Sequence, residues 1–248
     1  MLRAPLFAAT KRAMSTSTAT NAFHSRFQQY ALQLDATNER RERLVKASRD
    51  VTIHSKKVIF VIHRLNDSNR DKIVEQAEKD LAAVRDAHVS RVAREVEGVD
   101  YWKLKRAFSP GMQEFVEAAT VVEFCKTGKL LTLQQLNSSL CGVKDASGVS
   151  FSVDIDDYLL GIADLSGELM RLAVSSAASG QGLEASARIR GFVQALYEGF
   201  CLLFYNVDGG RDMTKKVEVM LQSLVKIETT CYSMHVRGSE YPASIVDS

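Results

Sequence analysis

Residues 35–65 read DATNERRERLVKASRDVTIHSKKVIFVIHRL, and this stretch carries the main signal for the fold class. Its apolar side chains recur at helical spacing, at Leu44, Ala47, Val51, Val58, Ile62 and Leu65. The stretch lies within residues 6–97, which contain neither glycine nor proline. A β protein needs a turn signal about every 8–12 residues. The missing breakers therefore predict an all-α fold.

Caps and apolar periodicity extend this prediction to seven helices, of which the two at the N-terminus are long. They run over about 35–65, from 71 toward 96, from Ser109 and Pro110 to Gly128, from Thr132 to a loop at 142–153, from Asp154 to near Gly180, over 185–206, and over 213–235 before Gly238. The expected architecture is a helical bundle.

Composition excludes several classes of protein. The 248 residues carry a net charge of +2, and no run of 18 uncharged apolar residues is present, so no transmembrane helix is expected. The four cysteines lie far apart without a C-x-x-C, which argues against a zinc ribbon or a disulfide scaffold. Phosphate-binding glycine loops, H-E-x-x-H and G-x-S-x-G are absent as well.

The N-terminus differs from the rest of the chain. Residues 1–34 contain four basic residues and no acidic one. We expect residues 1–26 to be a disordered basic extension, residues 27–242 to form the folded domain and residues 243–248 to be a tail. A basic, acid-free start is also typical of a mitochondrial transit peptide, which makes mitochondrial import one alternative for localisation.

The most informative side chains are carboxylates in apolar helices. Glu114 and Glu117 lie three residues apart in a largely apolar segment, and Asp164 and Glu168 lie four apart in another. Each pair shares one helix face. Buried like charges need compensation, either from arginine and lysine or from a divalent cation. Carboxylate oxygens suit Mg²⁺, with Mn²⁺ as the alternative, so the four predict either a metal site or an ion-pair network.

Cations lie close to both pairs in the sequence. Lys103, Lys105 and Arg106 stand among aromatic residues just before the first pair, and Arg171 follows Glu168 by three residues. Cations track phosphates and aromatic faces stack on unpaired bases, so we expect these four to contact the backbone of a nucleic acid. Arg171 could instead simply neutralise Glu168. An ordinary helix end with its charges in solvent is the alternative for residues 103–106.

Two segments resemble the translin superfamily, and within it the translin-associated factor X branch. These are residues 109–118, SPGMQEFVEA, and residues 157–171, DYLLGIADLSGELMR, with weaker support from residues 42–50 and 236–240. The resemblance implies a seven-helix bundle. It also implies the catalytic subunit of a hetero-oligomer with translin that cleaves single-stranded RNA with Mg²⁺, in small-RNA silencing or in processing of transfer-RNA fragments.

By the same resemblance, Glu114, Glu117, Asp164 and Glu168 are the catalytic and metal-binding set, with Glu117 and Glu168 as direct ligands. Nuclear and cytoplasmic localisation is expected, together with binding of single-stranded RNA or DNA and no attachment to membranes. A non-catalytic partner that regulates nucleic-acid binding by translin is the alternative function, and in that case the four acids form a structural ion-pair network.

Overall fold

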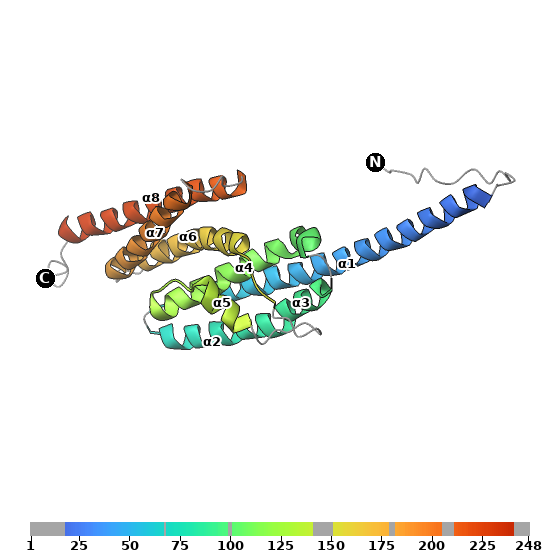
Figure 1. Cartoon of the computed structure of the whole chain (residues 1–248). Coiled ribbons are helices and arrows are strands. Elements are labelled where there is room, and N and C mark those ends of the chain that lie inside the picture. The colour runs from blue at the N-terminus through green and yellow to red at the C-terminus, as the bar shows by residue number, and fades with distance from the viewer. Residues whose placement is uncertain are drawn as a thin grey trace, which may run out of the picture. The chain divides into compact units, whose positions relative to one another are not determined.

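The computed structural model describes residues 18–66, 68–98, 101–140, 151–178, 182–204 and 211–240. Its helices are α1 (Thr18–Ile62), α2 (Arg70–Ala83), the π-helix η1 (Val84–Val89), α3 (Ser90–Val96), α4 (Tyr101–Thr127), α5 (Leu133–Leu140), α6 (Ile155–Ala178), α7 (Leu183–Phe204) and α8 (Arg211–Glu240) (Figure 1). Because α2, η1 and α3 run without a break, these described ranges hold seven uninterrupted helical stretches and no strand. The predicted all-α, seven-helix fold is confirmed.

The chain divides into two compact units, Met1–Glu42 and Arg43–Ser248, with the boundary inside α1. In the first unit, the helix begins at Thr18, so residues 18–26 do not form the disordered extension that we expected. Alanine, threonine and other non-breaking residues fill this stretch, which explains why a helix can include it. Residues 1–17 and most of the 142–153 loop lie outside the described residues.

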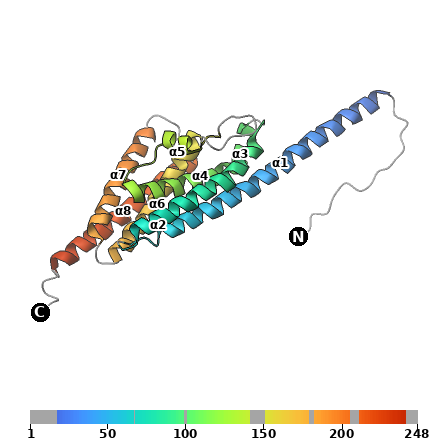
Figure 2. The same cartoon turned by 90° about the horizontal axis from the view of Figure 1, so that it is seen from below.

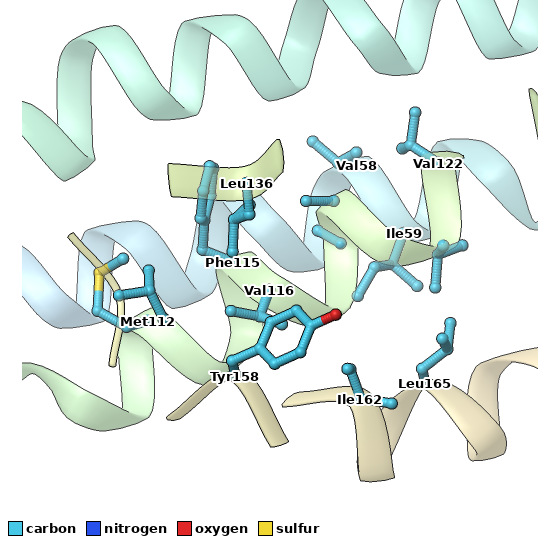
Figure 3. Packing of buried hydrophobic residues seen from close by; sticks show 14 of the residues in the cluster. Val58, Ile59, Met112, Phe115, Val116, Val122, Leu136, Tyr158, Ile162 and Leu165 are labelled. Atoms are coloured by element: carbon cyan, nitrogen blue, oxygen red, sulfur yellow. The ribbon is translucent and has the colours of Figure 1, made fainter. Parts of the chain in front are cut away.

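The second unit is built on a continuous apolar core. Figure 3 shows part of the hydrophobic cluster, with Val58 and Ile59 from α1, Val116 from α4 and Ile162 from α6. In Figure 2, α4 and α6 are neighbours, and their contact is among the most extensive between helices of the described chain. No described helix is both long enough and apolar enough to cross a membrane.

Two predicted caps are confirmed by hydrogen bonds. The Thr132 hydroxyl accepts from the Gln135 backbone N–H at 3.2 Å, while the Gln135 side chain accepts from the Thr132 N–H at 2.9 Å. The Asp154 carboxylate accepts from the Asp157 N–H at 2.9 Å at the start of α6. Both contacts satisfy backbone donors that a helix N-terminus leaves without partners.

Two predicted helix ends are wrong. The third helix begins at Tyr101 and contains Pro110, although proline inside a helix costs about 3 kcal/mol. Burial of Leu104 and Phe108 favours the longer helix. Ser48 compensates the break, because its hydroxyl donates to the Phe108 carbonyl at 3.2 Å and accepts from the Gly111 N–H at 3.1 Å. The last helix passes Gly238 and ends at Glu240, because one glycine near a helix end costs only about 1 kcal/mol.

Gly161 allows a close contact between α4 and α6. A Cβ added at this position would lie 2.7 Å from the Gln113 carbonyl oxygen and 2.7 Å from Val116 Cβ, which is closer than real Cβ atoms come. The two helices therefore meet one turn from Glu117 on α4 and one turn from Asp164 on α6. This contact brings the two acidic pairs to the same place.

Candidate functional site

All four predicted acids line one cavity of about 530 Å³ between α1, α4, α6 and α8, which we call the acidic cavity. Glu114 and Glu117 enter it from α4, and Asp164 and Glu168 enter it from α6. The side chains thus reach one compartment from two separate helices. Sequence spacing predicts only that each pair shares one helix face, and the structure brings both faces to the same cavity.

Glu117 is the least exposed member, with 7% of its surface accessible. Burial, followed by the charges of Glu114, Asp164 and Glu168, raises the pKa of its carboxyl to about 8, while the charge of Lys216 opposes the rise. Glu117 has no ion-pair partner within the part of the chain that the structure describes. Glu117 is therefore a buried carboxyl whose pKa is raised by the negative charges of the three other acids.

The other three acids each meet a cation. Lys56 Nζ lies 3.1 Å from Glu114 Oε1, and Lys216 Nζ lies 2.5 Å from Asp164 Oδ2. Lys216 also donates to the Leu160 carbonyl at 3.1 Å, which ties α8 to α6.

Glu168 has two basic partners. His63 Nε2 lies 2.5 Å from Glu168 Oε2, and Arg171 Nη1 donates to Glu168 Oε1 at 2.7 Å. Burial alone would raise the pKa of Glu168, but the hydrogen bonds and charges of His63 and Arg171 outweigh it, so the pKa lies below its ordinary value. Glu168 is therefore ionised at neutral pH, in contrast to Glu117.

The acidic cavity holds the donor chemistry of a Mg²⁺ site, although not its assembled geometry. Within the described residues, no group of three or more His, Cys, Asp or Glu side chains is placed so that it could hold a metal ion as it stands. Lys56 and Lys216 engage the carboxylates of Glu114 and Asp164 instead. Four oxygen-bearing side chains on one cavity, one of them without a cation, nevertheless fit a hard divalent cation.

Comparison with known proteins identifies the family. The model of the Translin family matches residues 39–238, which is most of the chain. The chain belongs to the Translin family.

Relatives of this Translin-family chain include a mouse protein named Translin-associated protein X, 36% identical over 87% of this chain and 79% of its own length. Chicken Translin is 30% identical over 56% of this chain and 58% of its own length. Among solved structures, AfC3PO in complex with duplex RNA has a TM-score of 0.58 at 22% identity, covering 85% of this chain and 97% of that one. The last match supports the fold.

The cations predicted to contact RNA are divided by the structure. Arg171 lines the acidic cavity, but Lys103, Lys105 and Arg106 do not. Lys105 Nζ lies 2.8 Å from Asp154 and 3.0 Å from Asp156, and 5.0 Å from the centre of the Trp102 ring. Lys105 therefore ties the start of α4 to the start of α6 in this Translin-family domain.

Several residues of the acidic cavity were not found from the sequence. They are Lys56 and Phe60 on α1, His63 directly after its end, and Lys215 and Lys216 on α8. The α1 residues do carry a signal, since positions 56, 60 and 63 follow helical spacing on one face. Phe60 is 69% exposed at the edge of the cavity. Nothing in the local sequence connects the two lysines of α8 with acids more than 40 residues away.

Proposed function

We propose that this chain is the Mg²⁺-dependent endoribonuclease subunit of a hetero-oligomer with a translin-like protein, and that it cuts single-stranded RNA. The observation that carries the proposal is the meeting of four carboxylates from two helices in one cavity, around the buried and unpaired Glu117. The relatives add support: the name of the mouse protein states its association with translin, and the AfC3PO structure contains RNA.

In this proposal, Glu117 and Glu168 bind Mg²⁺ directly and Glu114 and Asp164 complete its surroundings, with Mn²⁺ as a substitute. The bound cation supplies the charge that polarises the phosphodiester and lowers the pKa of the attacking water. The chain must also release these carboxylates from their cations. Lys56 is exposed and held by a single ion pair, so it can turn away from Glu114. Lys216 must leave the Leu160 carbonyl and the Gln113 side chain as well as Asp164.

Once released from the carboxylates, the cations of the cavity can bind the phosphate of the substrate. Lys56, Lys216 and Arg171 all line the cavity, so they can bind the non-bridging oxygens of a phosphate held there. His63 faces Glu168 and can place a proton at the leaving oxygen when the P–O bond breaks. Cleavage by water needs no protein nucleophile, which agrees with the absence of a Ser/His or Cys/His set in the sequence.

The test uses the chain purified together with its translin-like partner. Glu117→Gln and Asp164→Asn should each lower Mg²⁺-dependent cleavage of labelled single-stranded RNA by about 100-fold or more, the scale expected when a group that stabilises the transition state is removed. RNA binding in EDTA should remain. Asp156→Asn, an exposed acid outside the cavity, is the matched control and should cleave normally. Undiminished cleavage by both cavity variants discards the catalytic assignment.

A second candidate function is favoured by one observation. Glu114, Asp164 and Glu168 each meet a lysine, histidine or arginine, as the members of a structural ion-pair network would. The chain would then be a non-catalytic partner that modulates binding of single-stranded RNA or DNA by translin. In that case Asp164→Asn loses stability rather than chemistry, because Lys216 loses its charged partner, and the wild-type complex shows no dependence of cleavage on the metal.

A further inference from the structure

A second, larger cavity of about 1010 Å³ adjoins the acidic one, and we call it the basic cavity. It lies between the end of α1, the end of α4, the second half of α6 and the start of α7. His63 lines both cavities, so its side chain stands where one passes into the other. The two therefore form neighbouring parts of one surface.

The charged residues lining the basic cavity are all cationic or histidine. Besides His63 they are Arg64, Arg70, Lys126 and Arg188, and the lining contains no Asp or Glu. Arg70 donates to the Cys125 carbonyl at 2.5 Å, and Lys126 pairs with Glu78. Arg64 and Arg188 are exposed and have no ion-pair partner within the described ranges. Their positive charge is available to a ligand.

An aromatic pair forms another part of the lining. The rings of Phe124 and Phe192 lie 4.5 Å apart between centroids, and both side chains are half-buried. A cationic groove with aromatic rings is the arrangement that proteins use for single-stranded nucleic acid, since cations follow the phosphates and the rings pack on bases and sugars. The combination favours a nucleic-acid strand over a small anion, which would need only the charges.

The distance between the cavities fits a continuous strand. Along α6, Glu168 lines the acidic cavity and Ser175 lines the basic one. Seven residues of helix span about 10 Å at 1.5 Å each. A stacked strand advances by about 3.4 Å for each nucleotide, so Glu168 and Ser175 lie about three nucleotides apart, and the two linings adjoin between them at Arg171 and Leu172.

We infer that the basic cavity binds the phosphate backbone of single-stranded RNA about three nucleotides from the bond held in the acidic cavity. Arg64 and Arg188 contact the phosphates, and Phe124 and Phe192 pack against the nucleotides between them. The inference rests on the proposed function for the identity of the strand and for the position of the scissile bond.

The first experiment measures binding without cleavage. The chain carrying Arg64→Gln and Arg188→Gln, complexed with its translin-like partner, is titrated in EDTA against a fluorescent single-stranded RNA at several salt concentrations. Loss of two phosphate contacts should reduce the slope of log affinity against log salt by about 1.4, at about 0.7 per phosphate. If the affinities converge at 1 M salt, this slope makes the variant about 25-fold weaker at 0.1 M.

Two further variants control this result. Arg190→Gln with Lys226→Gln removes the same charge at exposed positions outside both cavities and should leave the slope unchanged. Arg64→Lys with Arg188→Lys keeps the charges and should also bind normally. A wild-type slope in the Gln variant overturns the inference.

The second experiment uses the unaltered protein, so it does not depend on how well a variant folds. RNA containing 4-thiouridine is crosslinked to the wild-type complex by light, and the modified peptides are identified by mass spectrometry. Crosslinks should appear in residues 124–128 and 185–192. Crosslinks confined to other peptides overturn the inference. If the variant with Arg64→Gln and Arg188→Gln binds weakly while Glu117→Gln and Asp164→Asn both cleave normally, the basic cavity stands and the catalytic assignment falls.

Discussion

Glu117 should make the chain less stable as pH rises, which is the opposite of an ion-paired carboxylate such as Glu168, and replacement by glutamine should remove this dependence. The folded-state pKa of Glu117 is about 8, whereas its ordinary value is 4.5. Below pH 4.5 the carboxyl is protonated in the folded and the unfolded chain, so it costs nothing. Between 4.5 and about 8 only the unfolded chain loses the proton, and stability falls as pH rises.

The size of the effect follows from the two pKa values. At about 1.36 kcal/mol for each pH unit, the full interval corresponds to about 5 kcal/mol, and the part between pH 5 and pH 8 to about 3–4 kcal/mol. Glutamine has nearly the same volume and cannot ionise. Glu117→Gln should therefore be more stable than the wild type by an amount that grows by about 3–4 kcal/mol from pH 5 to pH 8.

The assay is urea unfolding of wild type and variant side by side, in EDTA, at equal protein concentration and at several pH values between 5 and 8. Comparing the two proteins cancels the contributions of other titrating groups. Glu123→Gln on the same helix, outside both cavities, is the matched control and should give a constant difference. If the curves for Glu117→Gln and wild type run parallel across this range, the carboxyl is not buried among the other acids and the reasoning fails.

Three other outcomes test the same site. At pH 8, millimolar Mg²⁺ should raise the thermal midpoint of the wild type and raise that of Glu117→Gln much less, as differential scanning fluorimetry would show; equal shifts speak against a role for this carboxylate in binding. Lys216→Met should cost about 1–2 kcal/mol in EDTA, because the Asp164 carboxylate loses a charged donor in a partly exposed pair, and Mg²⁺ should restore most of it in urea unfolding. Gly161→Ala should destabilise the chain by about 1–3 kcal/mol, because the added Cβ clashes with α4. Gly191→Ala, where a Cβ meets nothing within 4 Å, is the control and should stabilise the chain by up to about 1 kcal/mol. The same effect from both substitutions would show that α4 and α6 do not touch at Gly161.

The acidic half of the site could be predicted because its information is local. Spacing of three and four residues places each pair on one helix face, and the apolar residues around each pair indicate that the helix is buried. Because the bundle is small, two acidic faces that are both turned away from solvent are expected to lie near each other in its interior. The prediction that Glu117 and Asp164 lie close together therefore required little more than the fold class. The role of Gly161, which allows the close contact of the helices, could not be predicted from the sequence.

Most of the cations that contact these acids could not be predicted by the same means, because nearness in sequence pointed to the wrong residues. Lys105 precedes Glu114 by nine residues, which puts it about 13 Å along the axis of α4 and half a turn around it. It faces Asp154 and Asp156 instead of the acids of the cavity. Of the cations that do meet these acids, only Arg171 lies beside its acid in the sequence, whereas Lys56 comes from α1 and Lys216 from α8. Tertiary packing alone brings Lys56 and Lys216 to these acids. A glycine contact between the two helices that bear the acids is therefore stronger support for a shared site than a positive charge that lies near an acidic motif in the sequence.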